Sequence, residues 1–327
     1  MNGKRIEWID IAKGIAIVLV IAGHTAEMGS FTRSIIFSFH IPLFFMLSGY
    51  TIKPAHSREE FLRGMKKDAL RLLLPYVLSA LAFALIQIFY RHNPAGVEFK
   101  NMAESLLWAS GTGDGKHEAI GILWFLASLF TARQIFRLTY LLFEEKGKQS
   151  FVPCAMLISL IGFGIGFIDW NWLIFNLDVS MAAVGFLLAG YEYRRYEETM
   201  DKYRPVLFPI AMILWMVLMK VFGYIEMSGR WYPEFSLGIL EALCGSYIVI
   251  SFCQSLTGFD RLKRALMTIG QASLMIMCVH AVEDRVFSFW SRGNTALMCF
   301  GRIAFDVCLG LLITFLLSRI RKKEVRQ

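Results

Sequence analysis

The stretch Ile9–Met28 reads IDIAKGIAIVLVIAGHTAEM, an almost unbroken apolar run of 20 residues. At roughly 1.5 Å per residue, a helix of this length crosses about 30 Å, which is the thickness of the hydrocarbon layer of a bilayer. Asp10, Lys13 and His24 interrupt the run, and no small-residue cleavage site follows it. We therefore interpret it as a retained transmembrane helix rather than a cleaved signal peptide.

Similar runs recur along the whole chain, which has 327 residues, 56% of them hydrophobic and only 18% charged, and a mean hydropathy of +0.51. This composition predicts an all-α, polytopic membrane helix bundle of about ten transmembrane helices. We expect a single domain over residues 1–327, with no separate soluble domain. The predicted spans are 9–28, 33–52, 70–90, 119–141, 151–169, 172–191, 205–224, 235–256, 266–287 and 296–318.

The net charge of +8 is distributed unevenly over the two sides of the predicted bundle. Most lysines and arginines fall in segments on the same side as the N-terminus, so the positive-inside rule predicts both termini in the cytoplasm and a multi-pass protein of the plasma membrane. The charge needs no nucleic-acid partner to explain it. The cysteines all fall in predicted spans without metal-ligand spacing, so we expect neither disulfides nor a bound metal.

Two connections between spans are long. The 53–69 connection is basic and predicted to be cytoplasmic, where it could lie on the anionic leaflet as a partly helical segment, meet an anionic substrate such as a nucleotide, or do both. The 91–118 connection ends in Gly111-Thr-Gly-Asp-Gly-Lys116. This motif lacks the spacing and the preceding strand of a phosphate loop, so we interpret it as a flexible loop.

Ionisable side chains are unusually frequent within the spans, although each costs roughly 2.5–3.5 kcal/mol to insert. A single one could simply form a hydrogen bond between helices. Many of them lie at similar depth, in the outer part of the predicted bundle, and this convergence favours a polar site that opens outward. These residues are His24, Glu27, His40, Asp178, Lys220, Glu241, Glu283 and Arg302, with His280 and Asp306 close to the same layer.

Arg302 and Asp306 are spaced i, i+4 on one predicted helix, which predicts a structural ion pair between them rather than a substrate clamp. Glu283 and Asp284 could simply face water.

His24 is the strongest candidate for chemistry, because imidazole has an unperturbed pKa near 6.5 and can accept a proton from a hydroxyl at neutral pH. Lys13 precedes it by eleven residues on the same predicted helix, a separation of about 16 Å. A substrate bound at one end of this helix could therefore reach toward the other.

Several motifs together resemble acyltransferase family three, near its fucose 4-O-acetylase-like branch. The first two motifs are specific, and the later ones are short. They are WIDIAKG at 8–14 with AGH at 22–24, FHIPLFFMLSGY at 39–50, RLLLPY at 71–76, LWFL at 123–126, and GQASL at 270–274 continuing to His280.

The resemblance covers nearly the whole chain and implies ten helices, a cytoplasmic acyl-CoA donor, and a hydroxyl acceptor that is commonly a surface or secreted glycan. It also implies that His24 is the catalytic base. Lys13 stands where many family members have arginine, so it can meet phosphate but without the bidentate fork of a guanidinium. Met46 and Leu47 lie in a stretch that is often more aromatic, and we interpret them as packing residues.

We therefore predict a site with three groups of residues. Beside His24, an acidic residue could orient the imidazole and His40 could donate to the oxyanion. The predicted catalytic group is His24, His40, Asp178 and Glu241. The group predicted to bind acetyl-CoA is Lys13, Lys67, Arg71, Ser48, Tyr50 and Trp124. The group predicted to bind the acyl acceptor is His280, Glu27 and Arg302.

The main alternative is a secondary transporter or flippase that uses the same buried charges for proton coupling. The two halves of the sequence show no paired interrupted helices of the kind common in transporters, which disfavours it. A membrane receptor built on a degenerate enzyme is a further alternative, disfavoured by the presence of both His24 and His40. Within the enzyme class, a succinyl or longer acyl group and a lipid-linked carbohydrate acceptor remain open.

Overall fold

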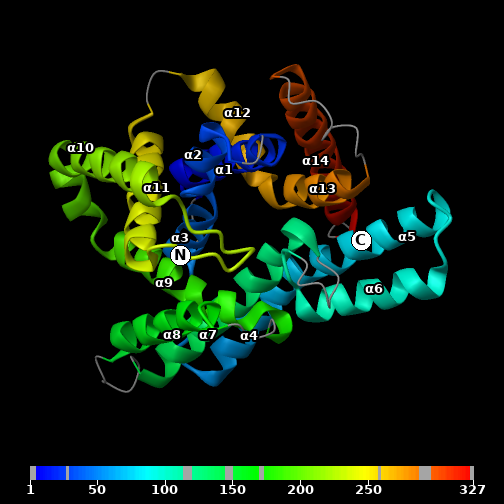
Figure 1. The fold of residues 1–327 in the computed structure, drawn as a ribbon, viewed down its shortest axis with the longest axis horizontal. Helices are drawn as coiled ribbons and strands as arrows, with labels where there is room; N and C mark the ends of the chain where they lie inside the picture. The colour runs from blue at the N-terminus through cyan, green and yellow to red at the C-terminus, as the bar shows by residue number, and fades with distance from the viewer. Residues whose placement is uncertain are drawn as a thin grey trace. The chain divides into compact units, whose positions relative to one another are not determined.

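The computed structural model describes residues 5–26, 29–112, 120–143, 150–168, 173–256, 259–286 and 296–324, with the side chains of 321–324 not described. The described segments are built of helices (Figure 1). The long helices are α1 (Glu7–Thr25), α5 (Leu74–Phe89), α6 (Ala95–Trp108), α7 (Trp124–Phe143), α8 (Phe151–Gly166), α9 (Leu177–Arg195), α10 (Glu197–Phe222), α11 (Phe235–Ser255), α13 (Ser273–Val286) and α14 (Ala296–Glu324). The shorter ones are α2 (Phe31–Phe37), α3 (His40–Thr51), α4 (Arg58–Asp68) and α12 (Asp260–Gln271).

Each predicted span overlaps at least one helix, which confirms the all-α polytopic architecture. Within the described residues, seven helical stretches are long and apolar enough to cross a membrane, or up to eight if a bent pair counts as one span. The predicted 33–52 span is one of them, as Phe31–Thr51, although the two turn residues Ser38 and Phe39 separate α2 from α3. The predicted 266–287 span was wrong in being continuous, because the chain bends by 66° between α12 and α13.

The chain forms two compact units. The terminal unit combines Met1–Ile36 with Ile248–Gln327, and the central unit is Phe37–Tyr247. The terminal unit therefore joins segments from the two ends of the sequence, which the order of predicted spans did not reveal.

The terminal unit depends on close packing of α1 against α12. Gly14 and Gly270 face each other across this contact, and a Cβ on Gly270 would overlap the backbone oxygen of Asp10. The Gln271 amide also donates to Asp10 Oδ2 at 3.1 Å. Small residues let two helices approach this closely, as is common between membrane helices.

The bend after α12 changes the direction of the chain while keeping it next to α1. The helix ends at Gln271 and α13 begins at Ser273, so the 66° bend is made at Ala272. Both α12 and α13 contact α1, and α13 also packs against α14. The bend therefore lets two consecutive helices, α12 and α13, both pack against α1.

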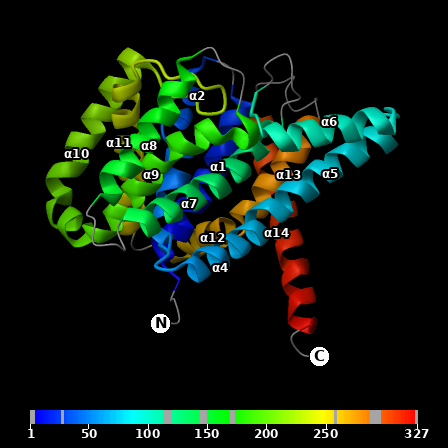
Figure 2. The same cartoon turned by 90° about the horizontal axis from the view of Figure 1, so that it is seen from below.

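In the central unit, α9 packs against α3, α7 and α8. A Cβ on Gly190 would overlap the backbone oxygen of Met46, so α9 and α3 also meet at a glycine. Beside this group, α5 and α6 form an antiparallel pair, seen side by side in both views (Figures 1 and 2). The Tyr76 hydroxyl of α5 donates to the Leu106 backbone oxygen of α6 at 3.0 Å.

The 53–69 connection is partly helical, as predicted, because α4 occupies most of it. Ser57 caps α4 by accepting a hydrogen bond from the Glu60 backbone N–H at 3.2 Å, and Glu60 accepts one from the His56 backbone N–H at 3.0 Å. This resembles a capping box. A π-helical turn over Ala69–Leu73 then joins α4 to α5. Pro75 follows this turn, and the wider turn accommodates a residue that cannot donate a helical hydrogen bond.

We predict that Gly270→Ala lowers the thermal stability of the purified protein, by about 1–3 kcal/mol if the added methyl forces α1 and α12 apart. Unfolding in detergent, followed by intrinsic fluorescence, measures the change. The control is Gly96→Ala on α6, where an added Cβ meets no described atom within 4 Å. Equal midpoints for the two variants would contradict the packing argument.

Candidate functional site

The terminal unit holds a cluster of ionisable side chains around His24, which we name the histidine cluster. Its members are His24 and Thr25 of α1, His280, Glu283 and Asp284 of α13, and Arg302 and Asp306 of α14. His24 lies near the C-terminal end of α1 and is half-buried. Its ring meets the His280 ring edge-on, with 5.5 Å between the ring centroids.

His280 is fully buried and fixed by a carboxylate. Its Nδ1 lies 2.8 Å from Asp306 Oδ2 and 3.4 Å from Glu283 Oε2. A histidine that donates through Nδ1 to a carboxylate has its tautomer set, which leaves Nε2 as the nitrogen available for chemistry. Among the described residues, no group hydrogen-bonds to Nε2 of His280. The structure therefore places a second, oriented imidazole beside His24.

Arg302 pairs with the other two carboxylates of the cluster. Its Nε lies 2.9 Å from Glu283 Oε2, and its Nη2 pairs with Asp284. Its Nη1 also approaches the Thr25 hydroxyl at 3.5 Å, next to His24. Buried charges of this kind are stable only when they are paired.

The predicted ion pair between Arg302 and Asp306 was therefore wrong. Both side chains reach from α14 to α13, where Arg302 pairs with Glu283 and Asp306 pairs with His280. The expectation that Glu283 faces water was also wrong, because its side chain is only 2% exposed. Although Arg302 and Asp306 are spaced i, i+4 on α14, both side chains pair with residues of the neighbouring helix α13.

The ligand atoms of His280, Glu283 and Asp306 lie within 4.8 Å of one another, a spacing that a metal ion could bridge. The guanidinium of Arg302 already supplies positive charge to Glu283. We therefore assign no metal to this cluster and interpret it as a charge-paired support for His24.

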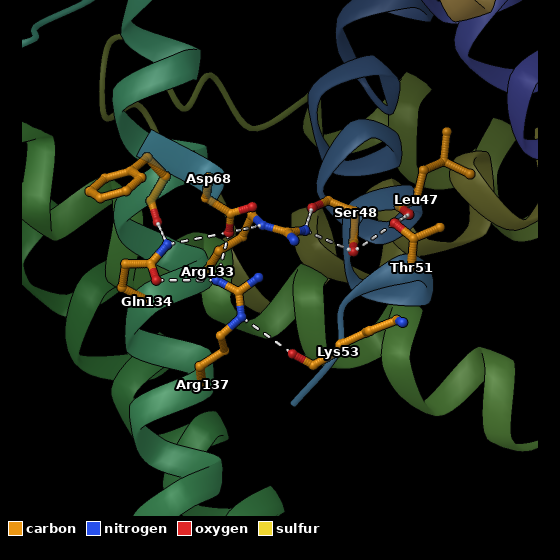
Figure 3. Close-up of polar contacts among 9 residues, drawn as sticks. Leu47, Ser48, Thr51, Lys53, Asp68, Arg133, Gln134 and Arg137 are labelled. Atoms are coloured by element: carbon orange, nitrogen blue, oxygen red, sulfur yellow. Dashed lines mark hydrogen bonds and ion pairs between the residues drawn. The ribbon is translucent and has the colours of Figure 1, made fainter. Parts of the chain in front are cut away.

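The central unit holds a second buried group of charges, which we name the arginine cluster (Figure 3). Its members are Ser48, Asp68, Arg133, Gln134 and Arg137, with the Lys53 backbone oxygen. Figure 3 shows the Arg133 side chain between Asp68 and Ser48. Arg133 donates to Asp68 Oδ2 at 2.7 Å and to Ser48 Oγ at 2.6 Å, and Arg137 donates to the same oxygen of Asp68 at 2.6 Å.

The remaining predicted catalytic residues lie in the central unit, each with its own surroundings. His40 is buried at the start of α3, with its ring 4.7 Å from that of Phe37. Asp178 forms an ion pair of 2.5 Å with Arg230. Glu241 is 1% exposed, and neither of its carboxylate oxygens has a hydrogen-bond partner among the described residues.

The predicted donor-binding residues differ widely in exposure. Tyr50 is buried and donates to Glu197 at 2.5 Å, and Trp124 is buried at the start of α7. Lys67 and Arg71 are exposed at the end of α4 and in the π-helical turn. Lys13 is half-buried in α1, within the terminal unit.

Ser48 is the one predicted donor-binding residue that joins the arginine cluster. Glu27, predicted to bind the acyl acceptor, lies outside the described residues.

Arg133 and Arg137 are site candidates that the sequence interpretation missed. Both belong to the basic residues that the sequence analysis assigned to the same side as the N-terminus, although both fall inside or at the end of the 119–141 span. Their i, i+4 spacing on one apolar helix was the available signal, since two buried arginines on one helix face require a partner. The partner, Asp68, is 65 residues away from Arg133 and could not be assigned from spacing.

The chain is similar in sequence to known proteins. A family described as an acyltransferase domain matches residues 6–319. The nodulation protein NolL of Mesorhizobium japonicum is 32% identical over 132 residues, covering 37% of this chain and 32% of that protein. NolL of Sinorhizobium fredii is 24% identical over 192 residues, covering 55% and 48%. The chain thus spans half or less of the length of these relatives. No solved structure matches.

We predict that Arg302→Met destabilises the protein strongly, by about 3–5 kcal/mol, because it leaves Glu283 buried without its cation. The double variant Arg302→Met with Glu283→Met removes both charges and should recover much of the loss. Thermal unfolding in detergent compares the two. Lys100→Met is the control, since Lys100 and Glu104 form an exposed pair with side chains 75% and 37% accessible. A double variant no more stable than the single one would refute the pairing.

Proposed function

This chain belongs to acyltransferase family three, and we propose that it transfers an acetyl group from cytoplasmic acetyl-CoA to a hydroxyl of an extracytoplasmic or lipid-linked glycan. It is a multi-pass membrane acyltransferase rather than a transporter or flippase. We place it in the plasma membrane with both termini in the cytoplasm. The distribution of lysine and arginine supports this orientation.

The observation that carries the proposal is the pair of imidazoles in the histidine cluster. His24 is the proposed base, and the carboxylate-bound His280 lies against it. Asp306 and Glu283 flank Nδ1 of His280, and Arg302 pairs with Glu283 and Asp284. In other acyl-transfer enzymes a carboxylate orients the catalytic imidazole, and here Asp306 orients His280, the imidazole beside the proposed base.

In the proposed reaction, His24 removes the proton of the acyl-acceptor hydroxyl as its oxygen attacks the thioester carbonyl. A new C–O bond forms, the C–S bond breaks, and the proton held by His24 passes to the departing thiolate. This direct transfer needs no acyl-enzyme intermediate. His280 and Arg302 are the proposed contacts of the hydroxyl-bearing substrate. Nε2 of His280 has no hydrogen-bond partner among the described residues, and Arg302 reaches Thr25, next to His24.

His40, Asp178 and Glu241 keep their proposed catalytic roles as a second group to be tested. Glu241 is the most informative of them, because a carboxyl group with two unpartnered oxygens is rare in a buried site. The proposed donor side comprises Lys13, Lys67, Arg71, Ser48, Tyr50 and Trp124.

We predict that His24→Gln lowers acyl transfer at least about 100-fold, the usual contribution of a general base. Purified protein with labelled acetyl-CoA, together with mass spectrometry of envelope glycans from cells lacking the gene and complemented with each variant, measures the loss. The control is His92→Asn, an exposed histidine with φ of 58° where asparagine is well tolerated. A folded His24→Gln protein with full activity would eliminate this mechanism.

A further inference from the structure

The arginine cluster carries more positive charge than its own residues neutralise. Arg133 and Arg137 both bond to the same oxygen of Asp68, and their side chains are only 12% and 6% exposed. Their other contacts are neutral: the Ser48 hydroxyl and backbone oxygen, the Lys53 backbone oxygen, and the Gln134 amide. Two guanidinium charges thus share one carboxylate charge, which leaves one buried positive charge unbalanced.

The surroundings add to this imbalance. Arg71 interacts electrostatically with Arg133 and repels it. Gly64 of α4 lies against the Arg137 guanidinium, so that a Cβ at Gly64 would come within 3.1 Å of Arg137 Nε. Among the described residues, Asp68 is the sole carboxylate paired with either arginine. The described residues therefore make room for the second arginine without supplying a second anion.

The arginine cluster also has hydrogen-bond donors that its described residues do not use. Each arginine donates to described residues through its Nε and Nη1 atoms. The Nη2 atom of each arginine donates to none of the described residues. Asp68 holds both guanidinium groups in place, so little conformational freedom is lost when an anion binds. Planar arginine forks of this kind suit phosphate oxygens particularly well.

A buried cation without a counter-ion is costly, and an anionic ligand removes that cost. The segments around the cluster also carry Lys53, Lys66 and Lys67, on the side predicted to be cytoplasmic. We propose that Arg133 and Arg137 bind a phosphate group of the donor's nucleotide, with Asp68 as the positioning residue. This rests on the proposed function, because the phosphate is that of acyl-CoA.

The test uses Arg137→Gln in the full-length protein, reconstituted in nanodiscs of phosphatidylcholine. This variant leaves Asp68 paired one-to-one with Arg133, so the thermal stability without ligand should stay unchanged or rise. Its affinity for CoA should fall about 10- to 100-fold, as expected for the loss of a charge-assisted contact. Its affinity for pantetheine, which lacks the nucleotide and its phosphates, should not change. Isothermal titration with CoA and pantetheine measures both.

The control is Arg195→Gln, which removes an arginine whose side chain is 63% exposed. It should leave CoA affinity unaltered. Wild-type affinity for CoA in Arg137→Gln would overturn the assignment. So would equal loss of CoA and pantetheine binding, which indicates general damage. If Arg137→Gln weakens binding to phosphatidylglycerol but not to CoA, the cluster binds a lipid headgroup instead. That result would also overturn the assignment.

The same measurements separate this proposal from the proposed function. A wild-type protein that binds CoA through Arg137 but transfers no acyl group supports the phosphate site and refutes the transfer reaction. A wild-type protein that transfers acetyl groups while Arg137→Gln keeps full CoA affinity does the reverse.

Discussion

The cost of burying charge among apolar helices controls both clusters of this protein. An ionised group inside a bundle is stable only beside an opposite charge, so each one fixes the helix that carries its partner. In the terminal unit, Arg302 and Asp306 of α14 are held by Glu283 and His280 of α13. In the central unit, Asp68 is held by two arginines on successive turns of α7. The first cluster has an excess of carboxylates and the second an excess of cations. The former surrounds the proposed base, and the latter is the proposed site of the donor's phosphate.

The geometry around His24 follows from a short chain of packing contacts. Close approach at Gly270 fixes α12 on α1, and the bend at Ala272 turns the chain so that α13 meets the other end of α1. His280 is thereby carried to His24 by the same segment that holds the start of the helix. Lys13 and His24 keep their separation because they share one rigid helix. The helices of the described terminal unit thus bring His280 to the proposed base.

The sequence was sufficient to predict the helices and the family, because both depend on local information. Span length and hydropathy located a helix at every predicted position, and the motifs around His24 pointed to the family that the comparison then showed. The bend at Ala272 was not predicted, because the apolar residues on both sides of Gly270–Ser273 read as one span. The partners of Arg302 and Asp68 were missed for a different reason. Spacing along one helix can suggest a pair, but only packing decides between a neighbour on the same helix and one on another.

The π-helical turn over Ala69–Leu73 has a consequence for how this protein can change through evolution. One extra residue in a turn rotates everything after it by about 100° relative to an uninterrupted α-helix. The polar half, α4, directs Asp68 to the arginines of α7, while the apolar half, α5, directs Tyr76 to α6. The π-helical turn changes which residues of α5 share a face with those of α4, although the two helices are continuous. Mutations that adapt the charged half to a new ligand are therefore not constrained by the lipid-facing pattern of the other half.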